Sequence, residues 1–365
     1  MRLKKNEIYA VIMAGGVGSR FWPRSRLLLP KQFLPIWHHR TLLEETCRRL
    51  RPLVPWENVI VVAGQKHASH VRRILPALPR QNLLLEPCGR STAPCIGLAA
   101  LHIQRRCPEA VMIVLPADHA IGDPRAFRLV LRTAIATARE QECLVTIGVT
   151  PTHPETGYGY IRTGAEVEGK RNALWVRSFH EKPSRRRAER FITSGEYLWN
   201  SGVFVFQVST ILRALRQFLP PVYHGLTRIV GSQRRKVQAL RSEYQRLPSV
   251  SIDHGVMEKV CQADTPLRLA VVPGDFGWAD VGSWDALAAF WQKDAKGNAV
   301  EGKAVLIDTH AAVVLSPSRL VALVGVEDVI VIDAGDAVLV CHRSQAQEVR
   351  RVVEELEKRG LRRYL

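Results

Sequence analysis

Glycines and basic side chains follow the first apolar segment of this chain within a few residues. The stretch AGGVGSRFWPRSRLLLPKQF covers residues 14–33 and contains three closely spaced glycines, which are Gly15, Gly16 and Gly18. Glycine adopts backbone conformations that let main-chain N–H groups face an anion. Arg20 would add a forked donor for phosphate oxygens, Lys31 a compact positive charge, and Arg24 and Arg26 further basic groups that close over the oxygens. This spacing favours a pocket for a polyphosphate over the simpler alternative, a tight turn followed by a solvated basic face.

Two aspartates occur in settings that suit a metal ion. Asp118 lies in LPADH, directly after the apolar residues VMIVL at 111–115, and Asp280 lies in GWADVGSW beside glycines and tryptophans. Mg²⁺ commonly uses one or two protein carboxylates together with phosphate oxygens and water. An aspartate at the end of a strand can instead cap the start of a helix. Because both carboxylates accompany the glycine-rich stretch, we interpret Asp118 and Asp280 as ligands of Mg²⁺.

Alternating strand and helix patterns in the first 150 residues would position these side chains. β-Branched apolar runs predict strands over residues 7–13, 58–63, 82–86, 111–115 and 143–149. Segments between them predict helices near residues 41–51, 66–75, 92–105 and 124–140. This order is typical of an α/β protein with a doubly wound, mostly parallel, Rossmann-like sheet and helices on both faces. Ligands of such sheets bind beyond the carboxyl ends of the strands, where the glycines and Asp118 fall.

The pattern changes twice further along the chain. Residues 151–290 are less regular, with strands expected around 157–162, 174–180 and 202–208 and helices near 184–193, 209–218, 249–260 and 283–291. From residue 294, short β-branched segments alternate with Gly, Asp and Asn and repeat loosely, which indicates a small β-domain such as a short β-helix. An amphipathic helix closes the sequence. We therefore predict a large catalytic domain over residues 1–293 and a small C-terminal β-domain with a terminal helix over residues 294–365.

Composition and charge narrow the class of protein. With 365 residues, of which 46% are hydrophobic and 24% charged, the chain has the composition of an ordinary globular protein. No apolar run approaches the ~20 residues of a membrane span, and the apolar segment near residue 10 is too short for a signal peptide. We therefore expect a cytoplasmic protein with no membrane partner. The net charge of +18 suits an anionic ligand. Because no segment resembles a DNA- or RNA-reading module, we expect no nucleic-acid partner.

Several conspicuous residues have simpler explanations. The seven cysteines form no CxxC pair and no cluster with histidine, so they indicate neither a zinc site nor a disulfide framework. Trp22 and Trp37 are expected to pack in the interior rather than to stack on a base. Asp253 is expected to cap a helix. The arginine-rich run at 184–190 is interpreted as the solvated start of a helix.

Further motifs follow one another along nearly the whole chain. They are EPCGRSTAP at 86–94, LPADH at 115–119, ETGYGYI at 155–161, FHEKP at 179–183, LWNSGVF at 198–204, SIDHGVMEK at 251–259, FGWADVGSW at 276–284 and the later GVEDVIVIDAGDAVLVC. Together with the glycine-rich stretch, this ordered set resembles the sugar-1-phosphate nucleotidylyltransferase family, and PKQF resembles its mannose-1-phosphate guanylyltransferase branch. The resemblance implies a glycosyltransferase-A-like fold for the large domain.

The resemblance also implies a reaction, in which GMP is transferred from GTP to mannose 1-phosphate to give GDP-mannose and pyrophosphate. The attacking oxygen of a sugar phosphate is already anionic, so the reaction needs no general base. It needs two polyanions held together and their charge neutralised. Glycines, basic residues and Mg²⁺ meet that need. We therefore expect catalytic roles for Arg20, Lys31 and Lys182.

The same resemblance assigns binding residues. The base, ribose and phosphates of GTP would contact Ala14, Gly15, Gly16, Gly18, Ser19, Arg20, Glu86, Ser91 and Thr92. The sugar phosphate would contact Gly157, Gly159, Glu181, Lys182 and Asn200. A carboxylate such as Glu86 accepts from guanine N1–H and N2–H₂, which adenine does not offer, and carboxylate and amide groups suit sugar hydroxyls.

Three alternatives stay open at this point. The family usually carries Asn where this chain has Ser91, so the strictness of the preference for guanine is not fixed, and a related transferase acting on another nucleotide or sugar 1-phosphate is one alternative. A regulatory relative that binds a sugar nucleotide without catalysis is another. The presence of Arg20, Asp118, Lys182 and Asp280 favours an enzyme. Small β-domains of this kind often support dimerisation, so a homodimer is a further hypothesis.

Overall fold

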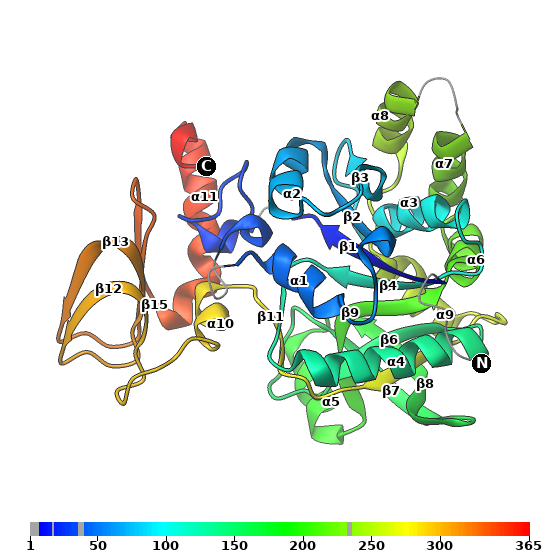
Figure 1. Ribbon diagram of the computed structural model, residues 1–365. Coiled ribbons are helices and arrows are strands. Elements are labelled where there is room, and N and C mark those ends of the chain that lie inside the picture. Colours follow the sequence, from blue (N-terminus) through cyan, green and yellow to red (C-terminus); the bar gives the residue numbers. More distant parts are fainter. Residues whose placement is uncertain (1–6, 17, 36–39, 232–235) are drawn as a thin grey trace. The chain divides into compact units, whose positions relative to one another are not determined.

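The computed structural model describes residues 7–16, 18–35, 40–231 and 236–365. The chain forms two compact units, each built from separate parts of the sequence (Figure 1). The first, called the sheet unit, comprises the residues up to Gly15 together with Thr46–Ala117 and Asp123–Trp278. The second, called the β-helix unit, comprises Gly16–Glu45, Asp118–Gly122 and Ala279–Leu365. The proposed domain boundary between residues 293 and 294 stays a prediction.

Parallel strands form one half of the nine-stranded sheet in the sheet unit. They lie in the order β3 (Leu83–Glu86), β2 (Val59–Gly64), β1 (Ile8–Ala14) and β4 (Val111–Pro116). Most residues of β1 are buried on both faces, as its continuous apolar sequence requires in a parallel sheet covered by helices. The predicted strands match these bounds to within one residue at each end. The predicted α/β class with a doubly wound sheet is confirmed.

The other half of the sheet is mixed. After β4 it continues with β9 (Tyr197–Gln207), β6 (Leu144–Val149), β10 (Leu269–Pro273), β8 (Lys170–Glu181) and β7 (Gly159–Val167). β6 and β10 are parallel, whereas β9 is antiparallel to both β4 and β6, and β8 is antiparallel to β10 and β7. The sequence analysis did not predict β10, because a short apolar run does not distinguish a strand from a buried helical segment.

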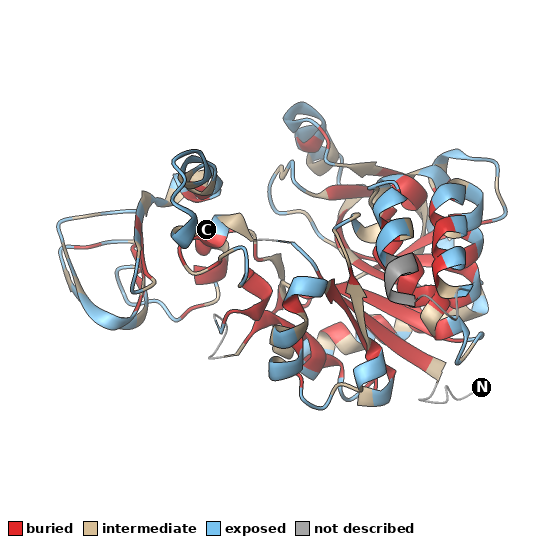
Figure 2. Ribbon diagram, turned by 90° about the horizontal axis from the view of Figure 1, so that it is seen from above, coloured by how far each residue is buried: buried red, intermediate tan, exposed pale blue. Residues whose placement is uncertain are grey.

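Helices pack on the faces of this sheet. They are α2 (Ala68–Ile74), α3 (Thr92–Gln104), α4 (Pro124–Glu140), α5 (Arg185–Ser194), α6 (Val208–Phe218), α7 (Pro220–Gly231), α8 (Lys236–Arg246) and α9 (Glu258–Gln262). α3 packs against α6 and α7, and α4 packs against β6, β9 and β10. The close approach around α3 depends on Gly97, where a Cβ would lie 2.6 Å from Leu226 Cδ1. Figure 2 shows the buried strands between helices whose outer faces are exposed.

The sequence analysis also missed α7 and α8. Pro220 and Pro221 interrupt the apolar pattern and indicate a break. Proline nevertheless suits the first turn of a helix, where its missing N–H costs nothing, and α7 begins at Pro220.

The β-helix unit contains a four-stranded sheet in the order β12 (Ala299–Ile307), β13 (Val313–Val324), β14 (Val329–Asp333) and β15 (Val338–His342). β12, β13 and β14 pair in parallel, and β15 is antiparallel to β14. Gly302 of β12 has φ 112°, and a Cβ there would lie 2.0 Å from Ser316 O, so only glycine allows the strands to approach this closely. The predicted small β-domain and its terminal helix, α11 (Arg350–Lys358), are confirmed.

Short elements from distant parts of the chain complete this unit. β5 (His119–Ile121) pairs with β11 (Trp278–Asp280), α10 (Trp284–Ala288) follows, and α1 (Leu42–Leu50) has residues in both units. Phe21, Trp22 and Trp284 pack in its core, which confirms the interior packing expected of Trp22. Trp37 lies outside the described residues. Within the described ranges, no helix combines the length and apolarity of a membrane span.

Candidate functional site

The predicted site residues are divided between the two units, with one group in the β-helix unit and two groups in the sheet unit. In the β-helix unit lie Gly16, Gly18, Ser19, Arg20, Lys31, Asp118 and Asp280. In the sheet unit lie Ala14, Gly15, Glu86, Ser91, Thr92, Gly157, Gly159, Glu181, Lys182 and Asn200.

Lys31 holds two carboxylates together in the β-helix unit. Its Nζ lies 2.9 Å from Asp118 Oδ2 and 3.9 Å from Asp280 Oδ1, and it donates to the main-chain oxygen of Val281 at 2.6 Å. Only 11% of the Lys31 side chain is exposed, so water screens these charges weakly. The structure thus brings together three residues from three motifs that are far apart in the sequence.

The charges of this cluster favour ionised carboxylates. Burial acts to raise the pKa of Asp118, but the Lys31 ammonium and His119 together outweigh it and hold the pKa below its usual range. Carboxylates offer the hard oxygen donors that Mg²⁺ accepts. Across the described part of the chain, no group of three or more His, Cys, Asp or Glu side chains could hold a metal ion. Asp118 and Asp280 are the two carboxylates that the Lys31 ammonium brings together, and their role as metal ligands stays a prediction.

Gly18 and the main-chain oxygen of Gly282 place Lys31 and Arg20 at this cluster. Gly18 has φ 68°, and a Cβ there would lie only 3.0 Å from Lys31 Cβ and Cγ. Arg20 is exposed, and its Nη1 donates to the main-chain oxygen of Gly282 at 3.4 Å. Because Gly282 follows Asp280 by two positions, Arg20 lies at the turn that carries this carboxylate.

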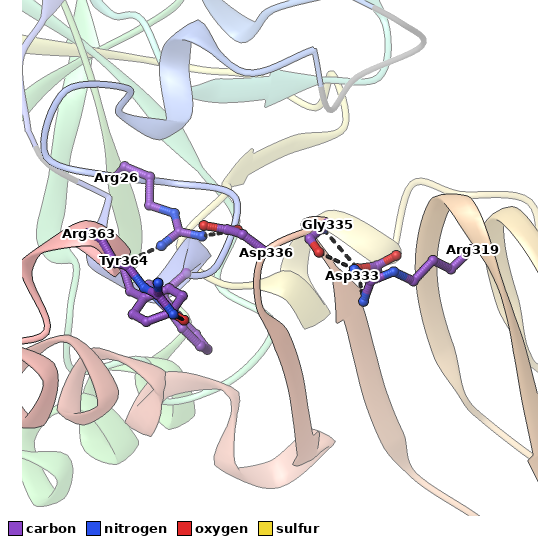
Figure 3. A network of polar contacts seen from close by, with 8 residues as sticks. Arg26, Arg319, Asp333, Gly335, Asp336, Arg363 and Tyr364 are labelled. Atoms are coloured by element: carbon purple, nitrogen blue, oxygen red, sulfur yellow. Dashed lines mark hydrogen bonds and ion pairs between the residues drawn. The ribbon is translucent and has the colours of Figure 1, made fainter.

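The other basic residues of the glycine-rich stretch have different partners (Figure 3). Arg26 Nη2 lies 2.8 Å from Asp336 Oδ1, and Arg26 Nη1 donates to the main-chain oxygen of Tyr364. Arg24 is partly buried, which lowers its pKa, while the Asp333 carboxylate acts in the opposite direction. The idea that all the basic residues of the stretch close over phosphate oxygens is therefore wrong for Arg26, whose guanidinium binds protein groups instead.

In the sheet unit, Gly159 allows two side chains to approach each other. Gly159 begins β7 and pairs with Glu181 at the end of β8. A Cβ at Gly159 would lie 2.6 Å from Glu181 Oε2 and 3.1 Å from Asn200 Cβ. Lys182 has φ 47°, a backbone conformation that residues other than glycine rarely adopt. Its Nζ lies 3.7 Å from Glu181 Oε1. The structure therefore gathers Gly159, Glu181, Lys182 and Asn200 at one point.

Asp253 joins this group through Asn200. The Asn200 Nδ2 donates to Asp253 Oδ1 at 2.8 Å, while Asn200 Oδ1 accepts from Thr146 Oγ1 at 2.9 Å and from Gly202 N at 3.2 Å. The expectation that Asp253 caps a helix is wrong, because its side chain receives this bond and the residue lies inside the π-helical turn Asp253–Met257. Such turns are frequent at functional sites. The SIDHGVMEK motif was the sequence signal, but it did not indicate a role.

Like charges crowd together at this point of the sheet unit. Burial and then the Asp253 carboxylate raise the pKa of Glu181 to about 7, although Lys182 opposes them. Burial likewise raises the pKa of Asp253. Glu258 Oε1 accepts the Glu181 N–H at 2.9 Å, and Glu258 Oε2 meets His254 Nδ1 at 2.8 Å. Glu181 Oε2 is buried and, among the described residues, has no hydrogen-bond partner. Glu181 can therefore accept from a hydroxyl or, when protonated, donate to one.

A further group in the sheet unit lies between β3 and α3. Glu86 ends β3, is 8% exposed and accepts a hydrogen bond from the Tyr244 hydroxyl. Burial raises the pKa of Glu86, and the bond from Tyr244 acts against this. Ser91 has φ 64° and ψ −169°, a conformation used almost only by glycine, and such strain is concentrated at functional sites. Thr92 Oγ1 accepts the N–H of Ile252 at 2.8 Å, which ties this turn to the SIDHGVMEK segment.

Two family models match the chain. Residues 9–297 match a model described as nucleotidyl transferase, and residues 302–356 match one described as MannoseP isomerase/GMP-like beta-helix domain. Mannose-1-phosphate guanylyltransferase of Escherichia coli (strain K12) is 39% identical in an alignment 367 residues long, which covers 98% of this chain and 75% of that protein. Xanthan biosynthesis protein XanB of Xanthomonas campestris pv. campestris (strain B100) is 40% identical over 97% of this chain and 74% of that protein.

A solved structure shares the architecture. The crystal structure from Thermus thermophilus named mannose-1-phosphate geranyltransferase is 40% identical to this chain and superimposes with a TM-score of 0.86. The match covers 96% of this chain and 99% of that one, so it includes both the mixed sheet and the β-helix.

Proposed function

Because the chain belongs to the nucleotidyl transferase family, we propose that it transfers GMP from GTP to mannose 1-phosphate and releases GDP-mannose and pyrophosphate. The name of the Escherichia coli relative, 39% identical over nearly the whole chain, supports this substrate pair. The observation that carries the mechanism is the cluster in which Lys31 contacts both Asp118 and Asp280. Such a cluster binds charged groups, as a transfer between two polyanions requires. The compartment expected from the sequence, the cytoplasm, stays a prediction.

The reaction is an in-line displacement at the α-phosphorus of GTP. An oxygen of the sugar phosphate forms the new P–O bond, and the bond to the β-phosphate bridging oxygen breaks, so that pyrophosphate leaves. The attacking oxygen carries its charge already, and no residue has to remove a proton. The chain's task is to hold the phosphates and to balance the charge that shifts onto the leaving group.

Arg20 and Lys31 are the basic groups that we assign to the triphosphate. Arg20 is exposed beside Gly282, and a planar guanidinium can bind two phosphate oxygens at once. Lys31 supplies a compact charge, and the main-chain N–H groups of Gly15, Gly16, Gly18 and Ser19 add further donors. Asp118 and Asp280 would hold Mg²⁺, which would neutralise phosphate charge when bound.

The sheet unit would bind the sugar phosphate. Lys182 would contact the phosphate, and the buried oxygen of Glu181, for which the described residues provide no partner, would contact a hydroxyl. One N–H of the Asn200 amide donates to Asp253, and its oxygen already accepts two bonds. Asn200 would therefore contact the sugar through its second N–H. The Gly157 N–H already donates to Glu155 Oε1 at 2.7 Å, so Gly157 would contribute mainly its carbonyl.

The base would lie near Glu86, Ser91 and Thr92, with Ala14 at the end of β1. Glu86 would accept from guanine through the carboxylate oxygen that the Tyr244 hydroxyl does not bind. Ser91 is shorter than the Asn that the family usually carries and stands in a strained conformation. Transfer from another nucleotide or to another sugar 1-phosphate by the same mechanism is the alternative that Ser91 leaves to be tested, whereas the name of the Escherichia coli relative supports GTP and mannose 1-phosphate.

One assay tests the proposal. Pyrophosphate release is measured with Mg²⁺ for GTP, ATP and dTTP, each combined with mannose 1-phosphate and with glucose 1-phosphate. We expect GTP and mannose 1-phosphate to give the highest kcat/KM, and Asp118→Asn and Asp280→Asn to lower it on the order of a thousandfold. Asp308→Asn is the matched control, because Asp308 is exposed at φ 44°, where asparagine is tolerated. Highest activity with another pair would establish the alternative, and no activity with any pair would contradict both.

The hypothesis of a homodimer draws support from the β-helix unit. Large apolar side chains are exposed on three of its strands: Val300, Val305, Ile307, Leu320, Val324, Val338 and Val340. Exposed apolar side chains at this density often mark a protein interface. Light scattering should give twice the monomer mass, and Val340→Lys together with Leu320→Lys should return the mass to that of one chain.

A further inference from the structure

Two side chains of the glycine-rich stretch bind one main-chain oxygen that lies more than 300 residues later in the sequence. Trp22 Nε1 donates to the oxygen of Tyr364 at 2.9 Å, and Arg26 Nη1 donates to the same atom. The other nitrogen of the fork, Arg26 Nη2, lies 2.8 Å from Asp336 Oδ1 in the turn between β14 and β15 (Figure 3). All four residues belong to the β-helix unit. One guanidinium therefore joins the stretch both to the β-helix sheet and to the segment 361–365.

Trp22 is fixed through its main chain as well. Its carbonyl oxygen accepts from Trp284 Nε1 at 3.0 Å, and both rings are buried. The Arg26 guanidinium lies over the Trp22 ring, 5.8 Å from its centre. Trp22 and Arg26 thus form one packed contact, in which each side chain limits the movement of the other.

The stretch between these anchors and Lys31 has little regular structure of its own. The amides of Arg24 and Ser25 donate to Phe21 O, and Arg26 and Leu29 exchange one pair of main-chain bonds. Leu28 is 68% exposed, so it adds little packing. Leu27 is 42% exposed as well, whereas Ser25 is buried, and the exposed part of such a turn opens at low free energy. The position of Lys31, two residues beyond Leu29, therefore depends on the contacts that hold the turns in place.

We propose that Trp22, Arg26 and the main-chain oxygen of Tyr364 form a clamp that positions Arg20 and Lys31 for the phosphates of GTP. The inference rests on the proposed function. Trp22 and Arg26 are positioning residues, because they act through the backbone that carries the phosphate-binding groups. A displacement of about 1 Å in such groups can slow a reaction about a hundredfold. The residues assigned to the sugar lie in the sheet unit, so the clamp should not alter binding of the sugar phosphate.

The ion pair of Arg26 with Asp336 and the bond from Trp22 to Tyr364 should contribute unequally to the positions of Arg20 and Lys31. Asp336 is 57% exposed, and an exposed ion pair contributes little. The bond from Trp22 to Tyr364 is partly buried, and its loss leaves a carbonyl oxygen with one donor fewer. Trp22→Phe should therefore have a larger effect than Asp336→Asn. Arg26→Lys keeps the charge but removes the fork, and a single ammonium does not reproduce both of its planar contacts.

The experiment compares four variants of the full chain by steady-state kinetics and by hydrogen exchange. Trp22→Phe, Arg26→Lys and Asp336→Asn test the clamp. Arg228→Lys is the matched control, because Arg228 forms an ion pair of 3.0 Å with Glu243 in the sheet unit, outside the unit that contains the clamp. For Trp22→Phe and Arg26→Lys we expect kcat/KM for GTP to fall about fivefold to tenfold, with KM for mannose 1-phosphate changed by less than about twofold. The amides of Arg24, Ser25 and Leu29 should exchange faster in the same two variants.

The outcomes separate the clamp from the proposed function. If the wild type turns over no substrate pair, the proposed function fails, and the clamp is then judged by exchange of the three amides and by the dissociation constant for GTP. If Trp22→Phe and Arg26→Lys lower only the melting temperature, with exchange and kcat/KM equal to those of Arg228→Lys, the clamp is contradicted. An equal rise of KM for both substrates would contradict it too, because it would indicate a general loss of structure.

Discussion

The group around Lys31 in the β-helix unit and the group around Glu181 in the sheet unit handle charge in opposite ways. In the β-helix unit, the Lys31 ammonium lies beside two carboxylates and holds the pKa of Asp118 below its usual range. In the sheet unit, burial raises the pKa values of Glu181 and Asp253, and the Asp253 carboxylate raises that of Glu181 further. The first arrangement keeps charges ionised and suits phosphates and a metal ion. The second keeps a proton available near neutral pH and suits the hydroxyl groups of a sugar.

Replacing Lys31 in the β-helix unit should have the largest effect on activity. Lys31→Gln would leave Asp118 and Asp280 without their ammonium, so the pKa of Asp118 should rise and the cluster should come to resemble the one in the sheet unit. We expect kcat to fall on the order of a thousandfold, because the triphosphate loses a buried positive charge. Pyrophosphate release and an NMR titration of the Asp118 carboxyl check the two effects. Lys66→Gln, at an exposed lysine of the sheet unit, should leave both unchanged.

Filling the space at Gly159 should break the second group. In Gly159→Ala the new methyl would lie 2.6 Å from Glu181 Oε2, so the carboxyl must move. KM for mannose 1-phosphate should rise about tenfold or more, because the buried hydroxyl-binding oxygen is displaced. Gly231→Ala is the control, since nothing lies within 4 Å of its added Cβ. Equal kinetics in the two variants would remove Glu181 from the sugar site.

The pH dependence should reveal the raised pKa of Glu181. Because its folded-state pKa is about 7 and the unfolded value is about 4.3, the group's favourable contribution to stability is complete below about pH 4 and is lost as the pH rises through about 7. The melting temperature of the wild type should therefore fall relative to that of Glu181→Gln between pH 5 and pH 8. KM for mannose 1-phosphate should change several-fold across the same interval in the wild type. In Glu181→Gln, only the titration of the substrate's own phosphate should remain.

The smallest effect is expected when the like charges are separated. Asp253→Asn removes the carboxylate that repels Glu181, so the pKa of Glu181 should move down toward its ordinary value. The midpoint of the KM profile should shift to lower pH, with KM itself changed only about threefold, because the introduced amide would still contact Asn200. An unchanged midpoint would show that burial alone raises the pKa. Asp264→Asn, at an exposed carboxyl of the sheet unit, is a suitable control.

Much of the fold could be predicted because its signals are local. The apolar runs of β1 to β4 are continuous and bounded by polar turns, and the helices α3 and α4 begin at recognisable residues, Thr92 and Pro124. β10 and α7 lacked such signals. A five-residue apolar strand is ambiguous, and a helix that starts with two prolines looks like a break.

The site was predicted as a set of residues, but its pairings were not. The motifs identified Lys31, Asp118 and Asp280, yet no sequence pattern states that one ammonium contacts both carboxylates. Asp253 was expected only to cap a helix, because its bond to Asn200 depends on how β9 and the π-helical turn meet. The different roles of Arg20 and Arg26 were also hidden. Arg26 differs through a carbonyl oxygen 338 residues away and a carboxylate 310 residues away.

The bond between Trp22 and Tyr364 also sets an order of events during synthesis of the protein. A ribosome adds about 5–20 residues per second, so the 342 residues between the two take between roughly 17 and 70 seconds to translate. For most of that time the nascent chain carries the indole of Trp22 and the ring of Phe21 without Trp284 and the later residues of the core that buries them. The sheet unit, whose last segment ends at Trp278, can be completed earlier. The loop assigned to the phosphates of GTP is therefore among the last parts of the protein to acquire its native contacts.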